Sequence, residues 1–135
     1  MTLQVALVVP EGEIWSGPAQ RVIAKTLDGD LGVLAGHTPV LGILSEGSVV
    51  RILGEEGGPT GGELTAAVAG GFLSVADDRV SILARDAQLG ADVDKSAVRA
   101  DLDAELQSAD HGPSAEESST ARYLRALLRA AGDEA

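Results

Sequence analysis

Alternation of apolar and polar residues from Thr2 to about Leu89 constrains the fold of this chain most. In the opening run, Leu3, Val5, Leu7 and Val9 occupy every second position. This period of two is typical of half-buried β-strands. It predicts further strands over residues 20–26, 31–34, 41–44, 48–53, 63–69, 72–76 and 79–84. Turn-forming residues separate these runs, so we expect an antiparallel β-sandwich or barrel.

The apolar period lengthens after Asp92, where a helical pattern begins. In residues 92–109, Val98, Leu102 and Leu106 recur at four-residue steps and form one apolar stripe. Asp92 or Asp94 is suited to cap the N-terminus of this helix. The break at residues 110–113 ends it.

A second helix is predicted after the break. Ser114 followed by Glu117 has the capping-box pattern. The apolar side of this helix consists of Ala121, Leu124, Leu127, Leu128 and Ala131. A short connection makes the two helices an antiparallel hairpin. The fold class is therefore mainly β plus α, with a sandwich domain over residues 1–90 and a hairpin domain over residues 91–135. Each helix has one thin apolar stripe, which predicts little burial.

The overall charge narrows the classes of partner. The formal net charge of −11 disfavours binding to nucleic acid and to anionic lipid. Cysteine is absent, which excludes disulfides and thiolate chemistry. No apolar run approaches the roughly 20 residues of a membrane span. We therefore expect a soluble, unprocessed, intracellular chain without direct membrane insertion.

His37 is the candidate for catalysis, and the residues around it give that hypothesis little support. Asp28 and Asp30 lie nearby in sequence, and Thr38 and Ser45 offer hydroxyls, but no nucleophile-elbow pattern surrounds them. A structural role in the loop or a contact role are the alternatives.

Metal and phosphate sites are predicted to be absent. His111 lies far along the chain, and neither histidine belongs to a known metal-binding spacing. The glycine-rich runs lack the ending of a phosphate-binding loop. The pair Gly70 and Gly71 indicates a bulge or close packing in a sheet.

Arg122, Arg125 and Arg129 are spaced three and four residues apart on the second predicted helix. At about 100° per residue they share one stripe, apart from the leucines. They could bind an acidic partner. They could also form a solvated face near the favourable C-terminal end of the helix dipole.

Three blocks of the sequence resemble a known family. These are "VALVVPEGEIWSG" (residues 5–17), "GDLGVLAGHTPVLGIL" (29–44) and "AVAGGFLSVADDRVSILA" (67–84). Their order and spacing resemble the epsilon subunit of bacterial F-type, proton-translocating ATP synthases, from Thr2 to about Leu89. The part after Leu89 resembles that family in architecture more than in sequence.

The resemblance implies a non-catalytic subunit of the central stalk that couples the gamma subunit to the c-ring. It implies that Asp30, Gly32, His37 and Pro39 belong to or lie beside the c-ring contact, and that another face packs on gamma. It also implies a hairpin that inhibits ATP hydrolysis when it extends between gamma and the alpha and beta catalytic subunits. The expected location is the cytoplasmic face of the bacterial cell membrane, peripheral through the complex.

The sequence departs from the family at two positions. Ala35 stands where the family usually has proline. Some relatives bind ATP through a motif of Ile or Leu, Asp, two variable residues, Arg and Ala; here Val93 and Asp94 fit, but Ala97 replaces the arginine. Arg99 is about 200° further around the helix and cannot substitute. We therefore expect no ATP cofactor.

Two other classes are weighed against this resemblance. A small-ligand-binding β-sandwich with a helical tail would carry an aromatic-lined face, and the chain has one Trp, one Tyr and one Phe. A small hydrolase using His37 would require catalytic partners that the sequence does not offer.

Overall fold

The computed structural model describes residues 2–54, 58, 62–108 and 118–132. Within these residues, ten strands form one hydrogen-bonded sheet. The strands are β1 (Leu3–Val9), β2 (Gly12–Ala19), β3 (Arg21–Thr26), β4 (Gly29–Leu34), β5 (Val40–Leu44), β6 (Ser48–Leu53), β7 (Glu63–Val68), β8 (Gly71–Ala76), β9 (Arg79–Ala84) and β10 (Ala87–Leu89).

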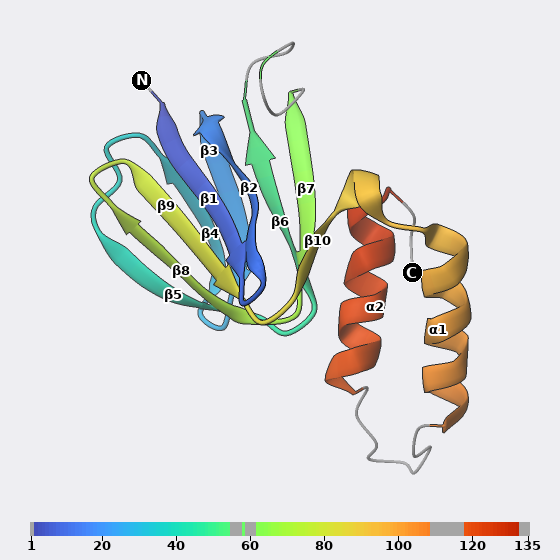
Figure 1. Ribbon diagram of the computed structural model, residues 1–135. Helices are drawn as coiled ribbons and strands as arrows, with labels where there is room; N and C mark the ends of the chain where they lie inside the picture. The colour runs from blue at the N-terminus through green and yellow to red at the C-terminus, as the bar shows by residue number, and fades with distance from the viewer. Residues whose placement is uncertain (1, 55–57, 59–61, 109–117, 133–135) are drawn as a thin grey trace.

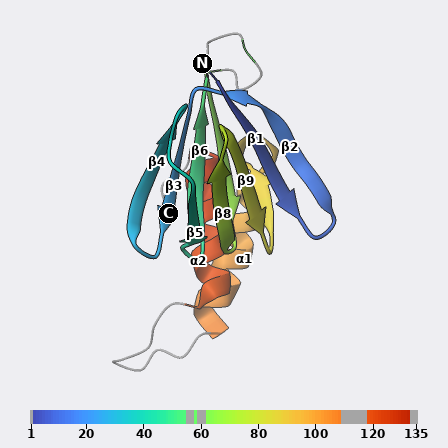
Figure 2. The same ribbon diagram turned by 90° about the vertical axis from the view of Figure 1, so that its left-hand side faces the viewer.

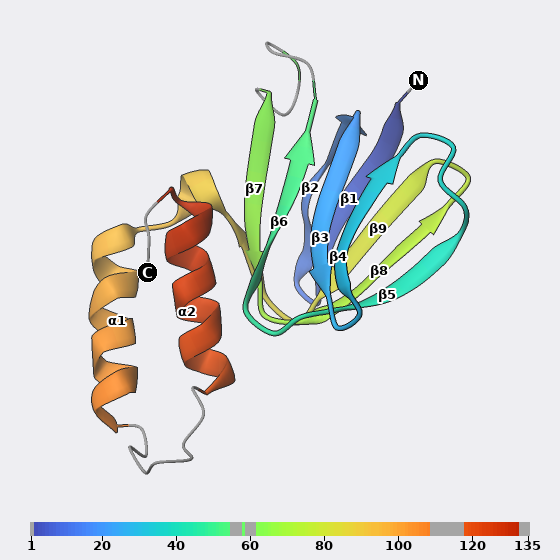
Figure 3. The ribbon, with the colours of Figure 1, turned by 180° about the vertical axis from the view of Figure 1, so that it is seen from behind.

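The sheet folds over on itself into two layers (Figures 1 and 3). One layer runs β10-β7-β6-β3 with β4 beside β3, and the other runs β5-β8-β9-β1-β2. The two layers are linked at β3 and β5 by one residue pair, Thr26 with Leu44. All strand pairs are antiparallel except β1 with β9, which are parallel. The predicted β-sandwich is confirmed.

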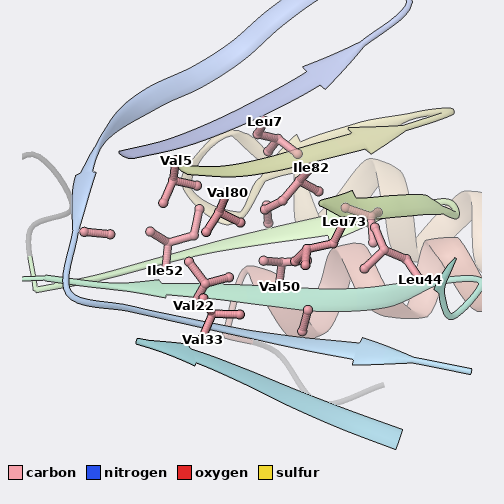
Figure 4. Close-up of a cluster of buried hydrophobic side chains, with 14 of the residues drawn as sticks. Val5, Leu7, Val22, Val33, Leu44, Val50, Ile52, Leu73, Val80 and Ile82 are labelled. Carbon is pink, nitrogen blue, oxygen red and sulfur yellow. The ribbon is translucent and has the colours of Figure 1, made fainter. Parts of the chain in front are cut away.

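Aliphatic side chains from both layers fill the space between them (Figure 4). Leu3, Leu7, Ile52, Leu73 and Ile82 are fully buried. Their inward positions alternate with outward ones along each strand, as the period-two pattern requires. At about 25 cal/mol per Å² of apolar surface, such burial is the main source of stability for the sandwich.

The sequence pattern missed the strands β2 and β10. In β2, Pro18 and Gly17 weaken the strand pattern, and Ile14 and Trp15 are adjacent rather than alternating. A register shift between Leu7 and Val8 interrupts the pairing of β1 with β2 at this point. β10 has three residues and pairs with β7, so tertiary contact rather than local pattern makes it a strand.

The two helices begin later than predicted. A 3-10 turn (η1, Gly90–Asp92) precedes α1 (Lys95–Ser108), and the Asp94 carboxylate accepts a 3.2 Å hydrogen bond from the Ala97 N–H. Asp94 is therefore the cap, and Asp92 is not. The helix α2 (Ser119–Ala130) is capped by Ser118, whose hydroxyl oxygen accepts from the Ala121 N–H at 3.1 Å. The predicted capping box at residues 114–117 lies outside the described residues.

The hairpin lies beside the first layer, with α2 packed on β6 and β7 and with α1 packed on α2 (Figure 1). The buried face of α2 is wider than the predicted stripe. Ala126 and Ala130 are buried with Ala121, Leu127 and Leu128, whereas Leu124 and Ala131 are partly exposed. Because α2 lies between the sheet and α1, it needs two covered faces. In the described part of the chain, no helix has the length and apolar character to cross a membrane.

Candidate functional site

The stretch that holds the predicted rotor residues spans β4 and the loop that follows it. Asp30 and Gly32 lie on the outward face of β4, whereas His37 and Pro39 belong to the loop before β5. A strand of six residues is about 20 Å long. The β3–β4 turn and the 35–39 loop therefore lie at opposite ends of β4 (Figure 2). The four predicted residues do not form one loop.

The β3–β4 turn exposes one apolar and two acidic side chains. Thr26 stabilises the turn, because its hydroxyl donates to the Gly29 carbonyl at 2.8 Å and accepts from the Asp28 N–H at 3.2 Å. Leu27 is 68% exposed at its tip. Asp28 and Asp30 are also exposed. This end of the sandwich thus offers negative charge beside an apolar contact.

The 35–39 loop is fixed at the other end of β4. The Gly36 N–H donates a 2.6 Å hydrogen bond to Oδ1 of Asp78, in the β8–β9 turn. Asp77 and Asp78 both have positive φ, at 52° and 60°, as the tight turn between these strands requires. The loop that contains Ala35 is therefore tethered to a neighbouring turn.

His37 has a structural environment in this loop. Its N–H donates to the Leu34 carbonyl at 3.1 Å, and its ring Nδ1 lies 2.7 Å from the Thr38 carbonyl oxygen. A catalytic histidine needs a hydrogen-bonded nucleophile and an orienting carboxylate. A ring held by the carbonyl of its own neighbour favours the loop or contact role.

None of the described helices or strands covers the outer face of the second layer (Figure 2), and this face carries exposed apolar side chains. Leu41 and Ile43 of β5 are 70% and 59% exposed, Phe72 of β8 is 44% exposed and Leu83 of β9 is 38% exposed. Ile43 pairs with Phe72, and Phe72 pairs with Leu83, so three of them form one row across the strands. We call these four residues the apolar face. It lies on the side of the sandwich away from the hairpin.

Sequence reasoning assigned no residues to this face, although a signal for it was present. In β5, β8 and β9 both alternating sets of positions carry large apolar side chains. Leu44, Leu73 and Ile82 point into the core, while Ile43 and Phe72 point outward. A strand that is apolar on both faces predicts cover on both faces. An exposed apolar patch on a folded chain is the usual mark of a protein contact.

The C-terminal end of α2 is held to the sandwich by hydrogen bonds. Thr65 of β7 donates from its hydroxyl to the Ala130 carbonyl at 2.6 Å. Arg129 donates to the Gly47 carbonyl, in the β5–β6 turn, at 3.1 Å. Half-burial of Tyr123 raises its pKa to about 12, with a smaller contribution from the charge of Asp86.

The arginine stripe is therefore not a simple solvated face. The backbone of Arg122 lies against Gly47, and the guanidinium of Arg129 is bound to it. Arg122 and Arg129 are exposed and Arg125 is partly exposed. The stripe borders the sandwich along one edge of α2.

An open groove of about 430 Å³ lies between Arg129 and the sandwich. Lys25 and Arg51 line it together with the acidic Asp30 and Glu46. Arg51 is paired with Glu63 at 2.5 Å, and this bond lowers the pKa of the Glu63 carboxyl. A groove lined by charges of both signs does not select a ligand of one sign. No group of three or more potential metal ligands is found among the described residues.

These features define a class of protein: a β-sandwich that presents one apolar face and carries a docked helical hairpin, as subunits of larger assemblies do. The chain belongs to the ATP synthase delta/epsilon chain family, whose β-sandwich domain model matches residues 2–90.

Two relatives that align with most of this chain are both ATP synthase epsilon chains. The epsilon chain of ATP synthase from Thermobifida fusca is 47% identical over 135 residues, covering 98% of this chain and 93% of the relative. That of Streptomyces griseus is 42% identical over 127 residues, covering 94% and 97%. The predicted resemblance to bacterial epsilon subunits is confirmed, as is the expectation of a non-catalytic subunit.

Solved structures share the fold. A chain of the Euglena gracilis mitochondrial ATP synthase, solved with OSCP, F1 and the c-ring, aligns with a TM-score of 0.68 at 21% identity. The alignment covers 97% of this chain and 79% of that one. A chain from the central stalk and c-ring of the Tetrahymena thermophila enzyme aligns with a TM-score of 0.58 at 20% identity, covering 96% of each.

Proposed function

We propose that this chain is the central-stalk subunit that couples the gamma subunit to the c-ring in a proton-driven ATP synthase. The observation that carries the proposal is the apolar face on the side of the sandwich away from the hairpin, in a chain of this family. With this face, one side of the sandwich would bind a partner subunit permanently. The hairpin on the other side would remain free to move.

The apolar face is the proposed docking surface for gamma. Ile43 and Phe72 lie at its centre and Leu41 and Leu83 flank them. A permanent contact between subunits is more apolar than a transient one. Exposure of these side chains to water is unfavourable in the free chain. Their burial against a partner would be favourable in the assembly.

The β3–β4 turn is the proposed contact with the c-ring. Asp28 and Asp30 offer carboxylates to basic groups there, and Leu27 adds an apolar anchor. Gly32 permits close approach of a partner because it has no side chain on the exposed outer face of β4. His37 and Pro39 lie beyond the far end of β4, so a partner touching all four predicted residues must extend along the outer side of that strand.

The hairpin is the proposed regulator. When extended, it would place Arg122, Arg125 and Arg129 against acidic segments of the alpha and beta catalytic subunits and oppose ATP hydrolysis. Charge complementarity supports this contact, because arginine binds carboxylates through a rigid fork.

The complex would hold the chain at the cytoplasmic face of the bacterial membrane. The Asp94 carboxylate caps α1, and with Ala97 in place of the arginine we expect no ATP cofactor.

ATP hydrolysis by the assembled enzyme tests the regulatory part. The full chain is compared with a chain ending at Asp92, after verifying that both enzymes retain all subunits. Release of hydrolysis by the shorter chain is the expected result. Unchanged hydrolysis with intact coupling would limit the function to the sandwich.

A second measurement tests the rotor role. Co-purification with gamma and the c-ring should persist for the chain ending at Asp92, because both proposed contacts lie in the sandwich. Loss of both partners would contradict the assignment of these surfaces.

A further inference from the structure

The hairpin and the sandwich have separate apolar cores. The sandwich core is complete without any helical residue. The hairpin cluster includes Ala67 of β7, with Val49 of β6 at its margin, as its contribution from the sandwich. The side chains that the sandwich contributes to this cluster are therefore few and small. Close backbone contacts and hydrogen bonds add to this apolar packing at both ends of α2.

Two glycines on the sandwich let α2 approach closely. A methyl group at Gly47 would lie 2.5 Å from the Arg122 carbonyl oxygen and 2.6 Å from its Cβ. A methyl group at Gly90 would overlap the Ala130 carbonyl and lie 2.6 Å from the hydroxyl of Thr65. Real Cβ atoms do not approach other atoms so closely, so any side chain at these positions displaces the helix or its neighbours.

Two hydrogen bonds between the sandwich and α2 lie beside these two glycines. Thr65 satisfies the Ala130 carbonyl, one of the last carbonyls of α2, which have no partner inside the helix. Arg129 reaches back to the Gly47 carbonyl. Each glycine contact is therefore accompanied by one hydrogen bond between the sandwich and α2.

We propose that Gly47, Gly90, Thr65 and Arg129 form a latch that holds the hairpin on the sandwich and sets the fraction of chains in which it is released. The proposal deepens the proposed function, because it names what regulates the hairpin. Arg129 has a part in both states, since its guanidinium leaves Gly47 when α2 turns to another partner. The latch itself is a property of the isolated chain.

A single introduced cysteine measures release directly, because the chain contains none. Ala66 and Ala67 are neighbours on β7 and both are fully buried, Ala66 in the sandwich core and Ala67 under the hairpin. A thiol reagent therefore reaches Ala67→Cys when the hairpin lifts. It reaches Ala66→Cys only when the sandwich opens. The labelling rate of each thiol reports the population of the corresponding open state.

Gly90→Ala is the informative variant, because Gly90 lacks the positive φ that would strain an alanine at Gly47. We expect it to raise the labelling rate of Ala67→Cys about tenfold or more, a change of about 1.4 kcal/mol in the docking equilibrium. The rate of Ala66→Cys should change less than twofold. Gly32→Ala is the matched control, because a methyl group at Gly32 meets open space.

Thr65→Val provides a second, independent variant. It removes the hydroxyl that binds the Ala130 carbonyl and adds no volume, so it should raise Ala67→Cys labelling several-fold even where Gly90→Ala fails to fold. Unchanged Ala67→Cys labelling in both variants, or equal acceleration of both thiols, would overturn the latch. Failure of the hydrolysis test would instead overturn the regulatory role and leave these labelling rates as they are.

Discussion

The Gly36 N–H donates a 2.6 Å hydrogen bond to the Asp78 carboxylate across 42 residues of sequence. This bond joins the β8–β9 turn to the loop that carries His37. Asp78→Ala should remove it and also place a less suitable residue at a φ of 60°. We expect a loss of about 1 kcal/mol in the free energy of unfolding, measured by urea denaturation.

Amide hydrogen exchange provides the local readout of that bond. The Gly36 amide should exchange faster in Asp78→Ala, while the core amides of β8 keep their protection. Asp78→Asn is the matched variant, because asparagine tolerates the left-handed region and its side-chain oxygen can still accept. Equal Gly36 exchange in all three proteins would contradict the tether.

Tyr123 makes the stability of the docked hairpin depend on pH. Burial, and secondarily Asp86, raises its pKa to about 12 from the ordinary value of 10.0. Below about pH 10 both folded and unfolded states keep the proton, so its contribution is complete there. As the pH rises, the unfolded state loses the proton first, and the contribution is lost through about pH 12.

Ultraviolet titration of the phenol tests this directly, because the chain has one tyrosine. We expect a midpoint well above the ordinary value of 10.0, and a lower midpoint in Gly90→Ala, in which the hairpin is released more often. Tyr123→Phe should abolish the titration and this part of the alkaline loss of stability. A midpoint near 10 in the unaltered chain would show that Tyr123 is not buried.

The apolar face should matter for assembly and little for folding. Ile43 is 59% exposed, so Ile43→Glu should change the free energy of unfolding by about 0.5 kcal/mol or less. A charge in the centre of a dry contact should weaken binding to gamma at least tenfold. Affinity measurement with purified gamma checks this, with Ala104→Glu on the exposed side of α1 as control. Equal affinities would exclude Ile43 from the interface.

Reversing one charge of the arginine stripe should release hydrolysis in the assembled enzyme. Arg125→Glu is the preferred variant, because Arg129 also takes part in the proposed latch. We expect the hydrolysis rate to rise about twofold or more, since the stripe would then repel acidic segments of the catalytic subunits. Lys95→Glu, at the start of α1, is the matched reversal and should leave the rate unchanged. Equal rates in all three enzymes would remove the stripe from the inhibitory contact.

The sequence predicted most of the sandwich because its strands are half-buried and alternate. Leu3, Val5 and Leu7 show the principle, since each points into the core. Two strands were not predicted: β2, which contains Gly17 and Pro18, and β10, which has three residues. Their pairing depends on partners elsewhere in the chain, and no local period records that. The sequence left two candidates, Asp92 and Asp94, for the cap of α1, and the structure shows that Asp94 is the cap. Ser118, which caps α2, was not predicted.

The candidate site was less predictable than the fold. The resemblance assigned Asp30 and His37 to one contact, but β4 separates the two residues. A resemblance based on residues that are neighbours in the sequence does not reveal which of those residues share a surface in the fold. The glycines that contact α2 were also missed, because Gly47 looks like an ordinary turn residue until the backbone of Arg122 is seen against it.

The parallel pairing of β1 with β9 has a consequence for how the chain is made. Gln4 lies opposite Arg79, so β1 pairs with a strand that is synthesised about 75 residues later. At about 5–20 residues per second, β1 waits several seconds for that partner during synthesis. The sandwich therefore closes late, and until then the apolar residues of β1 are a natural target for chaperones.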